Sequence, residues 1–353
     1  MTRFVSLHAA IVAAIVSVSW ASAASAVTIE TVPVGNPGNA ADTHGDGYGA
    51  VDYEYNIGKY EVTAGQYTEF LNAVADTDTY GLYNTDMWSN TYGCKIERSG
   101  SPGSYTYSVA DDWADRPVNY VSWGDAARFA NWLHNDQPTG AQGLMTTEDG
   151  AYFLNGATSD ADLMAANREA DWKWAITSED EWYKAAYHKN DGATGNYFDY
   201  PTSSDTAPGY VNNSGNLSTT GNPFVEDGTD PGNYATYDGD GGTLDDNGIG
   251  SPYYRTVIGE WENSDSPYGT FDQGGNVWEW NESILFGSFR GLRGGSFCFG
   301  DGSLRASYRD SINPTYEDIL LGFRVSEVPE PGTLALLALG AVGMLRRRRT
   351  VRG

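Results

Sequence analysis

The residues best suited to chemistry lie close together in the segment RGLRGGSFCF, residues 290–299. Ser296 carries a hydroxyl and Cys298 a thiol, and both groups act as nucleophiles in enzymes once a neighbouring base activates them. The only other cysteine, Cys94, lies in a distant segment. In an oxidising compartment the two thiols could form a disulfide that stabilises the fold by about 5 kcal/mol. Two separate buried thiols fit the sequence as well, so the pairing stays open.

Common catalytic motifs are missing from the chain. After the first 26 residues the histidines are His44, His134 and His188, and none has the HExxH spacing of a zinc hydrolase. The sequence has neither a glycine-rich phosphate loop that opens a helix nor a GxSxG elbow. A Ser-His-Asp site stays open, although no spacing points to one. Ser296 and Cys298 are therefore the only catalytic candidates.

Short elements must position these residues. Three capping boxes, each followed by apolar residues at helical spacing, predict helices that start at Thr63 with Gln66, Ser122 with Asp125, and Ser178 with Glu181. We expect short strands at Tyr53–Ile57, Val277–Trp280, Gly291–Phe299 and Gly322–Val325. Residues 191–252 are rich in turn-forming residues and show no sustained periodicity. The predicted fold class is therefore α+β with little regular secondary structure and three or more short helices.

Both ends of the chain have the character of sorting signals. Arg3 precedes an apolar run and the small residues Ala24, Ser25 and Ala26, which is typical of a secretory signal peptide. We predict that residues 1–26 are removed by signal peptidase, which leaves Val27 as the first residue. A membrane anchor is the weaker alternative, because the apolar run is short and a cleavage site follows it.

The other end resembles the PEP-CTERM sorting signal of Gram-negative bacteria. Residues 327–353 contain the sequence Val-Pro-Glu-Pro, an apolar run of 14 residues at 332–345 and an arginine cluster at 346–349. This run is shorter than the roughly 20 residues of a comfortable membrane span, and the arginines would hold its end on the cytoplasmic side. The resemblance implies transient membrane anchoring, processing by an exosortase-type enzyme, and a final place at the cell surface or in the extracellular matrix. An ordinary tail anchor would leave the Pro-Glu-Pro unexplained.

The charge of the chain restricts its partners. The whole chain carries −26 at pH 7, and residues 27–328 alone carry −31, because the two ends hold six of the 21 Lys and Arg residues. Such a field repels phosphate backbones, so we expect no nucleic acid partner.

Six segments, taken in order, resemble the formylglycine-generating enzyme (sulfatase-modifying factor) family. They are IGKYEVTAGQYTEFLNAV, RPVNYVSWGDAARFANWL, TSEDEWYKAAY, SPYGTFDQGGNVWEW, RGLRGGSF and LGFRV. The resemblance covers residues 53–326, with residues 27–52 as a lead-in. It implies a fold related to C-type lectins.

The enzyme of this family is a copper-dependent oxidase whose two cysteines stand three and eight residues after the serine of RGGS. Here those positions hold Phe299 and Leu304. Cys298 lies one residue short of the first position, and in an extended segment that shift would turn its thiol to the opposite face. A one-residue deletion in the alignment would restore the first cysteine but not the second. We therefore expect no copper.

The resemblance also implies a calcium site and a substrate groove. The calcium ligands would be Asp272, Gly275, Val277 and Glu279, a set of hard oxygen donors. A second calcium site would fall near Asn233, Tyr234 and Asp246. The groove would be lined by Arg293 and Ser296. The alternatives are that Glu279 is a paired strand residue, that Asp272 caps a turn, and that RGGS is a turn which the fold requires.

Two classes of function follow from these observations. The first is a non-catalytic, calcium-stabilised binding or matrix module with a peptide or glycan ligand. The second is a formylglycine-generating-type oxidoreductase, or another enzyme that acts in the same groove. A scaffold whose only role is display is a third hypothesis.

Overall fold

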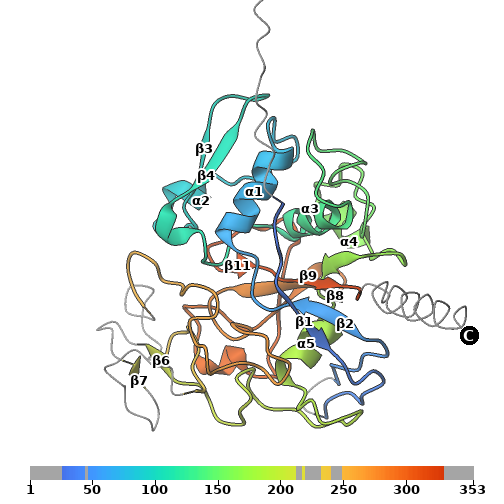
Figure 1. Cartoon of the computed structure of the whole chain (residues 1–353), viewed down its shortest axis with the longest axis vertical. Helices are drawn as coiled ribbons and strands as arrows, with labels where there is room; N and C mark the ends of the chain where they lie inside the picture. Colours follow the sequence, from blue (N-terminus) through green and yellow to red (C-terminus); the bar gives the residue numbers. More distant parts are fainter. Residues whose placement is uncertain (1–25, 44–46, 212–216, 219–231, 240–248, 330–353) are drawn as a thin grey trace, which may run out of the picture.

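The computed structural model describes residues 26–43, 47–211, 217–218, 232–239 and 249–329 (Figure 1). The predicted signal peptide up to residue 25 and the sorting tail from residue 330 lie outside these ranges. Within the described residues, no helix combines the length and the apolar character needed to cross a membrane.

The three predicted helices all begin where their capping boxes place them. They are α1 (Ala64–Val74), α3 (Trp123–His134) and α5 (Glu179–Tyr187). In α1 the Gln66 amide donates to Thr63 Oγ1 at 3.1 Å, and Thr63 N donates back to Gln66 Oε1 at 2.9 Å. The shorter helices are α2 (Asp86–Ser89), α4 (Asp160–Ala165), η1 (Asp111–Trp113) and η2 (Asp301–Leu304).

Two four-stranded sheets form the centre of the described fold. The first has the order β1-β2-β12-β5 and is antiparallel throughout, with β1 at Thr31–Val34, β2 at Tyr55–Gly58, β12 at Val325–Glu327 and β5 at Trp174–Ile176. The second has the order β10-β9-β8-β11, with β10 at Asp310–Ile312, β9 at Phe289–Arg293, β8 at Trp278–Leu285 and β11 at Leu321–Gly322. Only β11 runs parallel to its neighbour. Two-stranded sheets pair β3 (Ile96–Ser99) with β4 (Thr106–Val109) and β6 (Tyr210–Val211) with β7 (Leu217–Ser218).

Helices pack on both sides of these strands. In Figure 1, α1 and α3 lie above β8 and β9, and α5 lies below them. The centres of the buried Phe70 and Phe129 rings, from α1 and α3, lie 5.3 Å apart in an edge-to-face arrangement, a geometry that adds about 1 kcal/mol beyond area burial. Trp278 and Trp280 of β8 are buried. The α+β prediction is therefore confirmed.

One predicted strand is wrong in its second half. The strand expected at Gly291–Phe299 is β9, which ends at Arg293. Gly294 and Gly295 follow with φ of 95° and 75°, a left-handed conformation that favours glycine and turns the chain. Ser296 and Cys298 therefore lie beyond the turn, so strand alternation does not decide where the Cys298 side chain points. The segment predicted at Gly322–Val325 belongs to two strands, β11 and β12.

Candidate functional site

The turn after β9 holds Ser296 in the interior. A Cβ atom on Gly295 would lie 2.4 Å from Ser303 Oγ and 2.9 Å from Leu304 Cδ1, so this close approach requires glycine. Ser296 is fully buried, and its Oγ lies 3.7 Å from Cys298 Sγ. The serine and the half-buried thiol are thus neighbours, as their spacing predicts.

The guanidinium group of Arg293 makes its hydrogen bonds within the protein. Its Nε donates to Glu179 Oε1 at 2.7 Å, and its Nη2 lies 2.6 Å from the same oxygen. Nη1 donates to the carbonyls of Ala306, at 2.9 Å, and of Tyr308. Every guanidinium nitrogen therefore has a protein acceptor, and the side chain is only 1% exposed. The contacts favour the structural alternative, in which Arg293 ties β9 to α5. A role in the groove stays a prediction.

Apolar packing fills the two positions three and eight residues after Ser296. The Phe299 ring packs edge-on against Trp278, with 5.5 Å between ring centres. Leu304 is fully buried, and its carbonyl accepts a hydrogen bond of 2.9 Å from the Tyr187 hydroxyl. The apolar cluster around Leu304 contains Tyr200, Tyr210, Ala235 and Tyr237.

Burial disfavours the thiolate form of both cysteines. Both thiols are free, so the structure contains no disulfide between them. Cys94 is fully buried, and burial raises its pKa. Burial also raises the pKa of the Cys298 thiol, to about 11. Because the thiolate is the reactive form, burial lowers the nucleophilicity of both cysteines near neutral pH.

The four predicted calcium residues lie at the turn that enters β8. Asp272 is partly buried, with a pKa that burial raises to about 6, and one hydrogen bond of 2.6 Å reaches its Oδ2 from Gly259 N. A small cavity borders Asp272, lined by residues that include Tyr234, Trp261 and Gln273. A carboxylate in such a place has oxygen lone pairs and space to offer a hard cation.

Glu279 is already well paired. Arg324 donates to it through Nε at 2.6 Å and Nη2 at 2.7 Å, and the Trp182 indole donates to Oε2 at 2.7 Å. This agrees with the alternative that Glu279 is a paired strand residue. The three donors leave a lone pair on Oε1, so a further bond to a cation is still open to it.

The second predicted calcium site is only partly described. Asn233 accepts a hydrogen bond of 2.6 Å from Thr202 Oγ1, and Tyr234 is buried. Asp246 lies outside the described residues. Among the described residues, no three His, Cys, Asp or Glu side chains converge with the spacing of a metal site. A calcium site within them would therefore depend on backbone carbonyls as well as side chains.

Comparisons with known proteins bear on the whole chain. Residues 49–328 match the family model described as the sulfatase-modifying factor enzyme 1-like domain, and residues 327–349 match the PEP-CTERM protein-sorting motif. The chain belongs to the sulfatase-modifying factor family. Its sorting motif implies export, processing by an exosortase-type enzyme, and a surface or extracellular location.

Solved structures of similar proteins include three with low sequence identity. CarF is 18% identical, with 86% of this chain and 99% of that chain covered and a TM-score of 0.49. Variable protein 1 of Treponema denticola is 20% identical, with 86% and 98% covered and a TM-score of 0.44. PvdO of Pseudomonas aeruginosa is 16% identical, with 84% and 92% covered and a TM-score of 0.42. A comparison with curated proteins gave no match.

The residues of this sulfatase-modifying-factor domain do not fit a copper ion bound between two thiolates. Cu(I) prefers soft sulfur ligands, whereas Phe299 and Leu304 supply only carbon. Cys298 alone has a partly accessible sulfur near the serine. The positions three and eight residues after Ser296 therefore do not supply the two thiolates of such a copper site.

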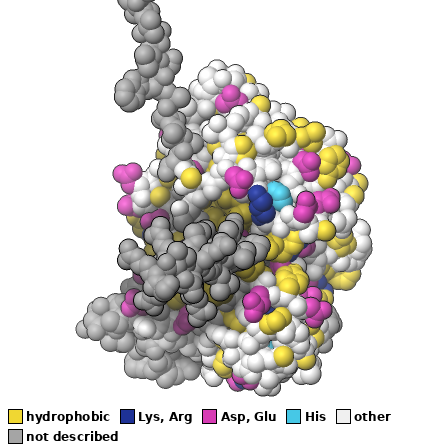
Figure 2. Space-filling view, turned by 45° about the vertical axis from the view of Figure 1, so that its right-hand side comes forward, with side chains coloured by type: hydrophobic (Ala, Val, Ile, Leu, Met, Phe, Trp, Pro, Cys, Tyr) yellow, Lys and Arg dark blue, Asp and Glu magenta, His cyan; other side chains and the backbone are white. Residues whose placement is uncertain are grey.

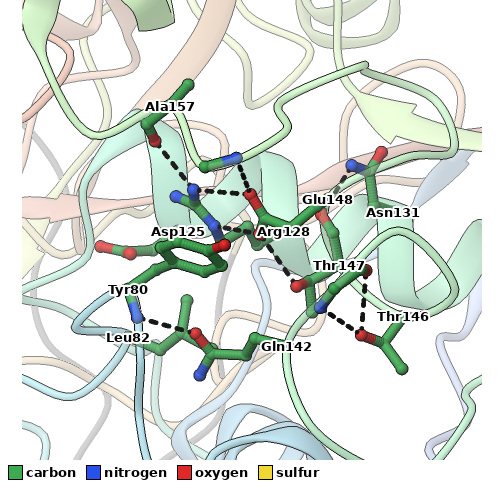
Figure 3. Close-up of polar contacts among 12 residues, drawn as sticks. Tyr80, Leu82, Asp125, Arg128, Asn131, Gln142, Thr146, Thr147, Glu148 and Ala157 are labelled. Carbon is green, nitrogen blue, oxygen red and sulfur yellow. Dashed lines mark hydrogen bonds and ion pairs between the residues drawn. The ribbon is translucent and has the colours of Figure 1, made fainter.

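In another buried ion pair of the domain, the protein itself supplies hydrogen-bond donors to both carboxylate oxygens (Figure 3). Arg128 of α3 donates to Glu148 through Nε at 2.7 Å and Nη2 at 3.1 Å, and Nη2 also donates to Ala157 O at 2.8 Å. The Thr147 hydroxyl and the Gly156 amide add bonds to the carboxylate. This network ties a long loop to α3, and its acceptors are satisfied by the protein itself.

The surface of the domain agrees with the acidic composition. On the face shown in Figure 2, acidic side chains are spread among neutral ones and basic side chains are sparse. On this face the acidic side chains are thus dispersed rather than gathered in one patch.

Sequence reasoning missed Glu61. Both of its carboxylate oxygens are buried without a hydrogen-bond partner among the described residues. In the sequence, Glu61 is marked only by its place between the apolar neighbours Tyr60 and Val62, shortly after β2.

Proposed function

We propose that this protein is a non-catalytic binding or matrix module, stabilised by calcium, on the outside of a Gram-negative bacterium. Signal peptidase would remove the first 26 residues, and an exosortase would process the tail after transient anchoring in the membrane. The ligand would be a peptide or a glycan bound in the groove near Ser296. A relation of the fold to C-type lectins belongs to this proposal.

One observation carries the non-catalytic part. The position eight residues after Ser296 is Leu304, which is fully buried in an apolar cluster. A metal ion there would need a sulfur ligand that the chain does not supply, and removing Leu304 from its cluster would open a cavity. The Leu304 side chain therefore contributes to the packing of the interior.

The calcium part is supported by buried negative charge. Asp272 lies partly buried beside a small cavity and receives one hydrogen bond. Its chemistry suits Ca²⁺ because oxygen ligands at a turn, together with the carbonyls of Gly275 and Val277 and the carboxylate of Glu279, form a hard donor set. When bound, the ion would neutralise this charge and hold irregular backbone in place.

The non-catalytic proposal is tested by anaerobic titration with Cu(I). The wild-type chain is expected to bind no Cu(I) tightly at the groove. A variant with Phe299→Cys and Leu304→Cys, which restores both thiols, is the matched comparison, and Phe299→Ser with Leu304→Ser controls for lost packing. Tight, stoichiometric Cu(I) binding by the wild type would contradict the proposal.

A second candidate is an enzyme with other chemistry in the same groove. The observation in its favour is the 3.7 Å separation between Ser296 Oγ and the half-buried Cys298 Sγ. Elemental analysis of purified protein separates the two candidates, because the second predicts a stoichiometric metal other than calcium. Peptide and glycan arrays then distinguish a binding module from a display scaffold, which would give a flat response.

A further inference from the structure

Glu61 differs from the other acidic side chains of the interior. It is 2% exposed, and neither Oε1 nor Oε2 has a hydrogen-bond partner among the described residues. The other deeply buried glutamates are each paired with an arginine: Glu148, Glu179, Glu181 and Glu279. An unpaired buried carboxylate is strongly disfavoured unless something outside the protein compensates for it.

The chain places Glu61 next to the Asp272 turn. The ring of its neighbour Tyr60 packs on Phe271, the residue before Asp272, with 5.7 Å between ring centres. A Cβ atom on Gly259, whose amide donates to Asp272, would lie 2.7 Å from the Tyr60 ring. On the other side, Val62 N donates to Phe323 O at 2.9 Å. Glu61 is thus held between the Asp272 turn and the segment that carries Arg324.

Arg324 donates no hydrogen bond to Glu61. Its Nε and Nη2 donate to Glu279, and Nη2 also donates to Phe271 O at 2.9 Å. Its Nη1 donates to Gly58 O at 2.9 Å. The guanidinium therefore neutralises one carboxylate of the three, and Glu61 and Asp272 remain.

We propose that Glu61 is an outer carboxylate of a buried divalent-cation site at Asp272 and Glu279. It contributes its charge, or a water bridged from it, rather than a direct bond, because no three acidic side chains converge on one point in the described residues. The inference rests on the calcium part of the proposed function. It adds that the site favours a divalent over a monovalent cation, since neither Glu61 nor Asp272 has an ion pair of its own among the described residues.

Glu61→Gln is the informative variant, since it removes the charge and keeps the shape. Loss of an outer partner typically weakens metal binding 10- to 100-fold, and we expect a drop of about that size in calcium affinity, measured by competition with a chelating dye. In EDTA the variant is expected to melt at or above the wild-type temperature, because the unpaired charge is gone. Glu30→Gln is the matched control: Glu30 is 61% exposed, pairs with Lys59 and should leave calcium affinity unchanged.

The outcomes separate this inference from the proposal on which it rests. If the wild type binds no calcium, the calcium part of the proposed function fails. If the wild type binds calcium and Glu61→Gln binds it equally well, only the role of Glu61 fails. A lower melting temperature of Glu61→Gln in EDTA would also overturn that role, because it would show that Glu61 is compensated within the protein.

Should Glu61→Gln fold poorly, Glu61→Asp keeps the charge and is expected to bind calcium within a few-fold of the wild type. Loss of binding in Glu61→Asp would count against the charge argument.

Discussion

The contact between Arg293 and Glu179 offers the sharpest test of whether the RGGS turn serves the fold or a ligand. Glu179 is 2% and Arg293 1% exposed as side chains, and the carboxylate also accepts from Arg309. Glu179→Gln keeps the size of the side chain but leaves Arg293 buried without a counter-charge. Breaking one partner of a buried ion pair destabilises a protein by about 3–5 kcal/mol.

We therefore expect Glu179→Gln to lower the free energy of unfolding by about 3–5 kcal/mol, measured by guanidinium chloride denaturation in excess calcium. Glu30→Gln, at an exposed pair with Lys59, should change it by about 1 kcal/mol or less. A loss below about 1 kcal/mol in Glu179→Gln would refute the reasoning. It would mean that the ion pair with Glu179 contributes little to the stability of the fold, so that Arg293 could bind a ligand instead.

Three further predictions follow from local contacts. Ser178→Ala removes the cap of α5, where Glu181 N donates to Ser178 Oγ at 3.1 Å, and should lower the free energy of unfolding by about 1 kcal/mol in the same denaturation assay. Burial and the neighbouring charge of Asp125 raise the pKa of Glu317 to about 8. Its folded form thus holds a proton that the unfolded form releases near its ordinary value, so wild-type stability should fall as pH rises from about 4.5 to 8. Glu317→Gln should remove that part of the slope, and an unchanged slope would contradict the assignment. Adding EDTA should lower the melting temperature, because calcium at 100 times its dissociation constant stabilises by about 2.7 kcal/mol; a scan indifferent to EDTA would count against a structural ion.

The helices were predictable because their signals are local. Each capping box places a side-chain acceptor three residues before a backbone donor, so Thr63, Ser122 and Ser178 mark helix starts without reference to the rest of the chain. Such patterns need only a few neighbouring residues to be read.

The end of β9 and the partners of the site residues depend on contacts far along the chain. Leu292 and Phe297 flank the RGGS segment, so we expected a continuous strand, yet the close approach of Ser303 and Leu304 requires a glycine turn. Glu179 and Arg293 are 114 residues apart. No local pattern predicts such a pair.

Glu61 illustrates a further limit of sequence reasoning. Glu61 lies in the first family-like segment, but the resemblance assigns it no role. What distinguishes Glu61 is that no donor among the described residues reaches its carboxylate. That property exists only after the turn at Asp272 and the Arg324 segment have been brought together. The resemblance to the family predicted Asp272 and Glu279 as calcium ligands, but it did not point to the nearby carboxylate of Glu61.

The most direct test of the account is product analysis with purified protein, copper, oxygen and a peptide that contains Cys-x-Pro-x-Arg. Mass spectrometry reports whether the cysteine of the peptide becomes an aldehyde. The account predicts that the peptide is recovered unchanged, with and without copper, while calcium still stabilises the protein. Copper-dependent conversion of the cysteine to formylglycine by the wild-type chain would contradict the central claim.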